Sequence, residues 1–441
     1  MGAGQPAQRG GASAREERSG DSGSRDEEAG KRSIDRKTGG KRGLSSLRLL
    51  HRSRLALGLA LVVAALAALP VMAQERGITP TEIILGTTAP LSGPAAPWGA
   101  TARGIEAYLQ YINEQGGIHG RTIRFEIRDD GYQPPRAVAN VLELVERVGV
   151  FGIVGMIGSA NAAAVRDYIF QNEVIWMTPA VESDPWIGNP NIHYLFVTYP
   201  NYYQEAKILA RYAVQELGKQ RVAVIYQNDQ YGSNGLRGVR DALAELGMAP
   251  VAEVSYELTD VDLSVHALRI GQARADAVIL YATPNHGVMA AAALAQLNPR
   301  PQILSSFTLA DPIMARLAGA AWDGVIVPSY FPYPGTDEKV DRVLQILVER
   351  NPELAAMAFN ALAGVTFIEP MLEGFRRAGP NLTKESFVAA MESIQNWDGE
   401  LLRGVTFGPG RRQGINRIFL ARMEGGVPHQ LTDWIEYPVE Y

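Results

Sequence analysis

The chain of 441 residues contains no cysteine. Disulfide bonds, thiolate nucleophiles and a lipid-modified cysteine at a signal-peptide cleavage site are therefore excluded. Histidine is scarce as well, and its six residues never pair at the spacing of metal ligands. The sequence also lacks the G-x-S-x-G motif of hydrolases and a Ser-x-x-Lys motif in a suitable context. These absences give no support for an enzyme, and we expect no metal and no cofactor.

Positive charge is scarce beyond the N-terminal region. The first 73 residues hold 13 of the 42 Lys and Arg residues and 7 of the 47 Asp and Glu residues, so the remaining 368 residues carry a formal charge of −11. Nucleic-acid binding depends on clustered Lys and Arg, so we expect no nucleic-acid partner. A length of 368 residues exceeds what one hydrophobic core usually covers, which predicts two domains.

Large apolar side chains are almost missing from residues 1–40, which predicts a disordered extension or a wrongly assigned start codon. Residues 41–73 then bring five basic residues, a run of fifteen uncharged apolar residues, and small residues at Val71 and Ala73. A permanent membrane helix needs about twenty apolar residues. The pattern therefore favours a signal peptide cleaved after Ala73 over an uncleaved anchor.

Strand-like and helix-like segments alternate from residue 81 onward. The order strand, loop, helix, glycine, strand over residues 81–128 recurs over residues 221–256. This alternation predicts an α/β fold of two similar lobes with parallel sheets, in which ligands bind at the carboxyl ends of the strands. Three helices and a C-terminal hairpin are expected after the second sheet, the helices near 337–350, 359–378 and 383–393.

A glycine-containing turn, "VFGIVGMIGSANAAAV" over residues 150–165, leads from an apolar strand into a helix. Its glycines fit neither the dinucleotide fingerprint nor the P-loop, and no lysine follows them. Free N–H groups at a helix start suit a phosphate or a carboxylate. Ser159 and Asn161 at this helix start are either plain caps or donors to a bound carboxylate.

Paired carboxylates, Asp129 and Asp130, end the strand predicted over residues 121–129. Such a pair can perform acid–base chemistry or can simply cap a loop. The corresponding strand of the second repeat ends in Asn228 and Asp229 instead. We therefore favour the loop role for the pair.

A specific resemblance rests on "LSGP" after the first strand, "GGIHGR" before the second, "RDDGYQPP" and "NDQYG". In this combination, the chain closely resembles the periplasmic solute-binding proteins of branched-chain amino acid ABC transporters, the leucine/isoleucine/valine-binding type, over essentially all of residues 77–441. The resemblance implies the type I periplasmic binding protein fold, with two Rossmann-like lobes joined by a three-crossing hinge. It places residues 78–198 and 328–408 in an N-terminal lobe, and residues 199–327 and 409–441 in a C-terminal lobe.

The resemblance also implies ligand-binding positions. Trp98 and Tyr231 match aromatic residues that lie against or close over the ligand. The donor turn matches Ile157, Gly158 and Ser159, which favours the carboxylate over the plain cap, and Ala180 matches a backbone contact. Thr283, at the end of a second-lobe strand, is added to this set.

Two positions depart from the family pattern. Glu182 stands where the amino-acid binders have a threonine, and Phe307 stands where they have the glutamate that holds the ligand ammonium. A buried ammonium without a partner costs several kcal/mol. Either Glu182 or Asp311 replaces that glutamate, or the ligand has no ammonium. Phe307 and the aromatic residues at other strand ends suit an apolar ligand body or belong to the core, namely Tyr281, Tyr330, Phe331 and Tyr333.

These observations lead to one expected function with alternatives. We expect a monomeric periplasmic component of an ABC importer that binds a small carboxylate or amide, most simply an apolar amino acid, and delivers it to an inner-membrane permease. A ligand sensor with the same two lobes, and a binder of an aromatic or aliphatic acid without an ammonium group, stay open.

Overall fold

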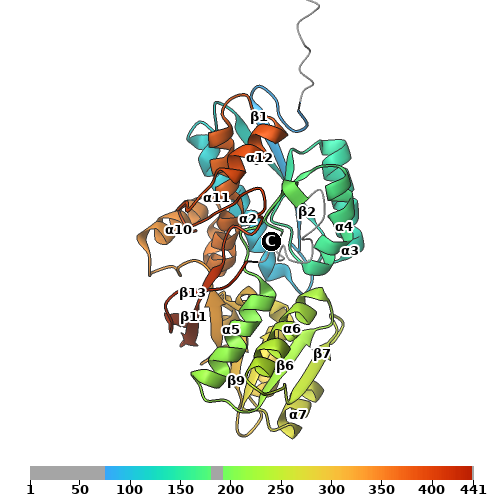
Figure 1. Cartoon of the computed structure of the whole chain (residues 1–441), viewed down its shortest axis with the longest axis vertical. Helices are drawn as coiled ribbons and strands as arrows, with labels where there is room; N and C mark the ends of the chain where they lie inside the picture. Colours follow the sequence, from blue (N-terminus) through green and yellow to red (C-terminus); the bar gives the residue numbers. More distant parts are fainter. Residues whose placement is uncertain (1–74, 180–191, 440–441) are drawn as a thin grey trace, which may run out of the picture. The chain divides into compact units, whose positions relative to one another are not determined.

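Two β-sheets form the centres of two lobes in the computed structural model, which describes residues 75–179 and 192–439 (Figure 1). The first sheet has five parallel strands in the order β2-β1-β3-β4-β5. The second sheet has eight strands, and seven of them follow the order β12-β11-β10-β9-β8-β6-β7, while β13 pairs with β11. Strands β6 to β10 are parallel and β11 is antiparallel to β10. The predicted α/β fold with two parallel sheets is confirmed.

The bounds of the elements follow the predicted alternation closely. The strands are β1 (Glu82–Ala89), β2 (Thr122–Asp129), β3 (Gly152–Val154), β4 (Ile175–Met177), β5 (Leu195–Phe196), β6 (Val222–Gln227), β7 (Ala252–Tyr256), β8 (Ala277–Tyr281), β9 (Gln302–Ser305), β10 (Ile326–Ser329), β11 (Arg417–Glu424), β12 (Val427–Gln430) and β13 (Ile435–Glu436). The α-helices are α2 (Ala100–Glu114), α3 (Pro134–Leu142), α4 (Ser159–Gln171), α5 (Tyr202–Gln215), α6 (Gln230–Glu245), α7 (Ser264–Gln272), α8 (Pro284–Leu294), α9 (Ile313–Ala318), α10 (Glu338–Arg350), α11 (Ala358–Ala378) and α12 (Lys384–Glu392). Short 3₁₀ helices are η1 (Ala96–Gly99), η4 (Ile192–Tyr194), η5 (Phe307–Leu309), η6 (Gly319–Trp322) and η7 (Pro352–Met357), and the π-helical segment η2 (Glu143–Val148) continues α3.

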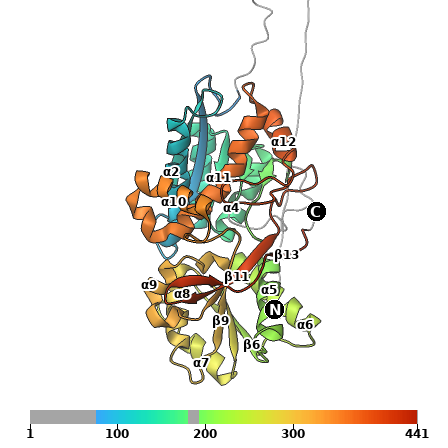
Figure 2. The same ribbon diagram turned by 90° about the vertical axis from the view of Figure 1, so that its left-hand side faces the viewer.

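Helices cover both faces of the first sheet (Figure 1, Figure 2). Strand β1 lies inside this sheet and is buried from Ile83 to Ala89, because a parallel strand packed on both faces needs apolar or small residues on both sides. Helices α2 and α11 pack together on one face, and α3 and α4 pack together on the other. Since α10 and α12 contact α2 and α11, these late helices belong to the first lobe.

The chain passes between the lobes after β5, after β10 and after α12. Each passage follows from the order of the elements, because β6 to β10 and β11 belong to the second sheet while α10 to α12 pack on the first lobe. The exact residue limits of the lobes stay a prediction.

Helix α6 begins at Gln230, soon after the end of β6. Asp229 is the reason, because its carboxylate accepts a hydrogen bond from the N–H of Gly232 and so caps the helix. The predicted C-terminal hairpin is confirmed as β11 and β12, which turn at Gly425 and Gly426.

One described stretch, residues 352–378, is long and apolar enough by composition to cross a membrane, and 78% of its most apolar window is buried inside the protein. It contains η7 and α11, which packs against α2, α12 and β4. This burial explains its apolar composition, since a helix that is apolar all round suits the core of a large protein.

Candidate functional site

A cavity lies among the segments that follow the carboxyl ends of strands from both sheets. About 490 Å³ of space is free between its lining atoms, including the part continuous with solvent. Nine of the sixteen described lining residues are aromatic and none is charged. The lining consists of Trp98, Thr101, Tyr132, Ile157, Gly158, Ser159, Tyr199, Tyr202, Tyr231, Phe307, Thr308, Tyr330, Phe359, Asn360, Ala363 and Phe367.

The turn before α4 supplies one wall of this cavity. Gly158 has φ +106°, and a Cβ at this position would lie 2.8 Å from the ring of Tyr132, so the turn requires glycine. No side chain caps α4, and the Ser159 hydroxyl, in a residue only 1% exposed, has no hydrogen-bond partner among the described residues. A buried hydroxyl without a partner costs free energy unless a bound group satisfies it. This wall therefore presents a free hydroxyl and the positive end of a helix dipole.

Trp98 and Tyr132 form a second wall from the first lobe. Their rings meet edge to face at 5.6 Å. The indole N–H of Trp98 donates to the main-chain oxygen of Thr308 at 2.8 Å, and the amide of Gln227 donates to the Tyr132 hydroxyl at 3.3 Å. Both bonds join a first-lobe residue to the second lobe, one at Gln227, the last residue of β6, and the other at Thr308, which follows β9. The structure is thus closed around the cavity.

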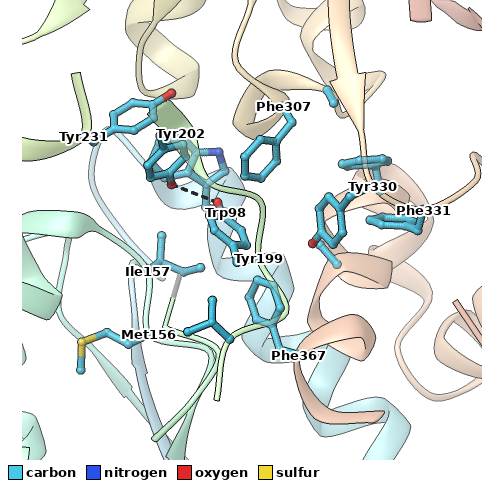
Figure 3. Packing of buried hydrophobic residues seen from close by; sticks show 14 of the residues in the cluster. Trp98, Met156, Ile157, Tyr199, Tyr202, Tyr231, Phe307, Tyr330, Phe331 and Phe367 are labelled. Atoms are coloured by element: carbon cyan, nitrogen blue, oxygen red, sulfur yellow. Dashed lines mark hydrogen bonds between the residues drawn. The ribbon is translucent and has the colours of Figure 1, made fainter. Parts of the chain in front are cut away.

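The second lobe contributes Tyr231 and η5. The hydroxyl groups of Tyr231 and Thr308 lie 2.7 Å apart. Phe307 stacks on Tyr202 at 5.7 Å with 18° between the ring planes, and it meets Tyr199 edge to face at 4.7 Å. Figure 3 shows these rings turned toward one another, with Ile157 on the side of the first lobe. Much of the cavity surface is therefore a continuous set of packed aromatic rings.

Helix α11 completes the lining with its first turns. Asp311 does not line the cavity, because its carboxylate is buried and accepts hydrogen bonds from the backbone N–H groups of Asn360 at 2.9 Å and Ile313 at 2.8 Å. Burial raises the pKa of Asp311 to about 6, against these backbone hydrogen bonds. Asn360 itself lines the cavity. Asp311 thus positions the start of α11.

The structure brings together six of the ten residues predicted for the site, namely Trp98, Ile157, Gly158, Ser159, Tyr231 and Phe307. It does not bring Thr283 to the cavity. The Thr283 hydroxyl lies 2.6 Å from Nδ1 of His286, and its N–H donates to the hydroxyl of Tyr256. Ala180 and Glu182 lie outside the described residues. Of the aromatic residues at strand ends, Tyr330 lines the cavity, whereas Tyr281, Phe331 and Tyr333 are buried elsewhere.

Several lining residues have no motif that could reveal them. Tyr132, Tyr199, Tyr202 and the α11 residues are separated in sequence by more than two hundred positions at the extremes. Tyr132 is the exception among these four groups, because it follows the Asp129–Asp130 pair in the "RDDGYQPP" motif. Its backbone φ of +64° is held by a hydrogen bond from its N–H to the Asp130 carboxylate.

The Asp129–Asp130 pair builds the loop around Tyr132. Asp129 accepts from the N–H of Leu91 and the hydroxyl of Ser92, and Asp130 accepts from the hydroxyl of Thr88. The loop role expected for the pair agrees with these bonds. Among residues 75–179 and 192–439, no group of three or more metal-ligating side chains occurs.

The profile of the family described as periplasmic binding protein matches residues 82–427. A Leu/Ile/Val-binding protein homolog 3 of Brucella melitensis is 26% identical over 303 residues, which cover 68% of this chain and 80% of that protein. The leucine-specific-binding protein of Salmonella typhimurium is 25% identical over 264 residues, 59% of this chain and 71% of that protein.

Two solved structures share the fold. A branched-chain amino acid ABC transporter protein from Thermus thermophilus with bound valine superposes with a TM-score of 0.75 at 19% identity, over 81% of this chain and 97% of that chain. A fatty acid ABC transporter substrate-binding protein from Thermomonospora curvata superposes with a TM-score of 0.74 at 21% identity, over 82% and 95% of the two chains. Both similarities extend over nearly the whole of the neighbour.

Proposed function

The chain belongs to the periplasmic binding protein family, and from this premise we propose that it is the substrate-binding component of an ABC importer. Its ligand is a small carboxylate with an apolar body, held between the two lobes and passed unaltered to an inner-membrane permease. The Ser159 hydroxyl carries the proposal, because it is buried, free of a described partner and placed at the uncapped start of α4 inside the cavity.

The relatives support a transport role. They are a leucine-specific-binding protein and a Leu/Ile/Val-binding protein homolog. One of the two solved structures holds valine and the other is a fatty acid transporter component, so one ligand has an ammonium group and one does not. The family therefore supports a carboxylate, while the fold by itself is compatible with both kinds of ligand.

Lobe closure explains how binding becomes a signal for the permease. A ligand that contacts both walls of the cavity stabilises the closed form relative to the open form. The Trp98–Thr308 hydrogen bond is an interaction of the closed form that such a ligand would reinforce. We propose that the permease distinguishes the closed protein from the open one.

We further propose that the protein works as a monomer in the periplasm after cleavage near Ala73. The uncharged apolar run that precedes the small residues Val71 and Ala73 supports this cleavage site. Sequencing the N-terminus of the exported protein and measuring its mass in solution test both statements.

A thermal-shift screen of amino acids, aromatic and aliphatic acids, short amides and ureas tests the binding role. A ligand at 100 times its Kd adds about 2.7 kcal/mol to the free energy of unfolding. Uptake of the same compound by cells with and without the gene then tests transport. A compound that emerges chemically changed, or a screen without any stabilising acid or amino acid, contradicts the proposal.

A further inference from the structure

The cavity contains no charged side chain among its described lining residues. This matters because an ammonium group taken out of water needs a carboxylate or several hydrogen-bond acceptors in return. Among residues 75–179 and 192–439, the candidates are buried carboxylates just outside the lining, and each of them already has its own donors.

Glu205, in the first turn of α5, is a carboxylate that accepts a hydrogen bond directly from a residue of the lining, Phe307. It is fully buried, and it accepts hydrogen bonds from the N–H of Phe307 at 2.5 Å, the hydroxyl of Tyr281 at 2.8 Å and the hydroxyl of Ser306 at 3.1 Å. Phe307 lines the cavity and Glu205 does not. Glu205 therefore fixes the position of η5 and leaves an aromatic ring, not a carboxylate, on the cavity surface.

Asp311 and Asp229 are occupied in the same manner. Asp311 accepts from the N–H groups of Asn360 and Ile313, and Asp229 accepts from the N–H of Gly232 and the amide of Gln227. Neither aspartate lines the cavity. Both carboxylates cap helices, so neither is available as the partner of an ammonium.

Helices from both lobes begin at the cavity, and their first turns contribute residues to its lining. The lining includes Thr101 of α2, Ser159 of α4, Tyr202 of α5, Tyr231 of α6 and Asn360 of α11. Each helix N-terminus carries about half a positive charge. Asp229 and Asp311 offset two of these ends, but no side chain caps α4. The field in the cavity therefore favours an anion and opposes a cation.

Aromatic rings offer the one alternative way to hold a cation, through contact with a ring face. In this cavity, many pairs of rings meet edge to face. Tyr199 meets Phe307 with 71° between ring planes at 4.7 Å, and Tyr202 meets Tyr231 with 65° at 4.8 Å. In such pairs, the face of one ring is engaged by the edge of its neighbour. This packing favours an apolar ligand body over a caged ammonium.

We propose that the ligand is a monocarboxylic acid with an apolar or aromatic body and no ammonium group. This inference rests on the proposed function. Its carboxylate lies at Ser159 and the start of α4, and its body lies among Trp98, Phe307 and the neighbouring rings.

Matched ligands that differ only in charge test the inference. The probes are 3-phenylpropanoate against phenylalanine, and 4-methylpentanoate against leucine, with 3-phenylpropanamide and 3-phenylpropylamine as neutral and cationic controls. Binding is measured by calorimetry on the purified protein after unfolding and refolding, which removes any ligand that co-purifies. We expect at least one acid to bind 100-fold more tightly than its amino acid, with the amide between them and no binding of the amine.

The outcomes separate this inference from the proposed function. If phenylalanine or leucine binds as tightly as its deaminated partner, the inference is overturned while the binding role stands. Loss of that amino-acid binding in Glu182→Gln would then identify the ammonium partner. Preferential binding of a trimethylated amino acid also overturns the inference, because such a ligand carries a cationic nitrogen. If no acid, amide or amino acid binds, the proposed function fails together with the inference.

Discussion

The indole N–H of Trp98 donates a hydrogen bond to the main-chain oxygen of Thr308 at 2.8 Å, across 210 positions of sequence. Trp98 follows β1 of the first sheet and Thr308 follows β9 of the second, so this bond joins the two lobes beside the cavity. A bond of this kind exists in the closed form and must be exchanged for water when the lobes separate. Under the proposed function, this bond connects ligand binding with closure.

Trp98→Phe removes the donor and keeps a ring. Because one hydrogen bond contributes about 0.5–1.5 kcal/mol net, we expect ligand affinity to fall about 3- to 10-fold with little change in the free energy of unfolding. Trp98→Ala also removes part of the cavity wall and should weaken binding further while the protein still folds. Calorimetry measures both. Trp434→Phe, a more exposed tryptophan that packs on Phe419, is the control and should bind normally.

Ser159→Ala removes the free hydroxyl at the start of α4. A hydrogen bond to a charged group contributes about 1.5–3 kcal/mol, so the affinity for a carboxylate should fall by about 10- to 100-fold. The melting temperature without ligand should not decrease, since the hydroxyl has no described partner to lose. Ser393→Ala, at the end of α12, is the control. An unchanged affinity in Ser159→Ala would remove the proposed anion site.

Tyr132→Phe removes the hydroxyl that accepts a hydrogen bond from Gln227 across the lobes. The bond is long, at 3.3 Å, so we expect a loss of only about 2- to 5-fold in affinity. The effect should appear mainly as faster ligand dissociation, measured by stopped-flow fluorescence. Tyr168→Phe, whose hydroxyl contacts Glu146 at the surface, should dissociate ligand at the normal rate. Equal rates in both variants would contradict a role of Tyr132 in closure.

Phe307→Glu places a carboxylate on the cavity surface, next to the aromatic rings. If the natural ligand lacks an ammonium, this change should lower the preference for an acid over the matching amino acid by at least about 10-fold, because the new carboxylate pairs with the ammonium. Phe307→Gln introduces a side chain of the same size as glutamate but without its charge, and this variant serves as the control. The ratio of the two dissociation constants is the readout, and an equal ratio in both variants would refute the expectation.

Glu369, inside α11, gives a prediction about pH. Burial raises the pKa of Glu369 to about 7 from 4.5, although its carboxylate accepts hydrogen bonds from the N–H groups of Glu400, Leu401 and Leu402. The native protein therefore holds this proton more tightly than the unfolded chain between about pH 4.5 and 7. The contribution of Glu369 to the free energy of unfolding must fall as the pH rises through that window, by at most about 3 kcal/mol.

Glu369→Gln should remove this part of the pH dependence. Urea unfolding at pH 5 and pH 8 measures how the free energy of unfolding changes with pH in the variant and in the unsubstituted protein. The two changes are compared with each other, because burial also raises the pKa of Asp130 and Asp311 in both proteins. Glu373→Gln, one turn further along α11, is the matched substitution on the same helix. An identical slope in Glu369→Gln and the unsubstituted protein would contradict the assignment.

Part of the site could be predicted because it depends on local chain geometry. Gly158 and Ser159 follow a strand and begin a helix, so the sequence shows both the required glycine and the donor. Tyr231 lies at the start of α6 after β6, and Trp98 lies in η1 after β1. In open α/β sheets, ligands bind at the carboxyl ends of the parallel strands. The confirmed boundaries of β1, β2 and α10 to α12 depend on periodicity in the same way.

The roles of other residues could not be predicted from the local sequence. Asp311 is a candidate ammonium partner by sequence, yet tertiary packing sets its carboxylate at the start of α11. Glu205 has no motif, and its role as the anchor of η5 exists only because α5 packs beside β8 and β9. Tyr199 and Phe367 become neighbours at 5.6 Å only when both lobes are folded.

The sequence by itself determined the alternation of strands and helices, the sheet edge at which the cavity lies, and the glycine turn that precedes Ser159, because these depend on side-chain periodicity and on the turn between one strand and one helix. Only the tertiary structure decided which rings enclose the cavity and which buried carboxylates are already occupied. Those properties depend on contacts between segments hundreds of residues apart, and the free energy of each contact exists only after both lobes have packed.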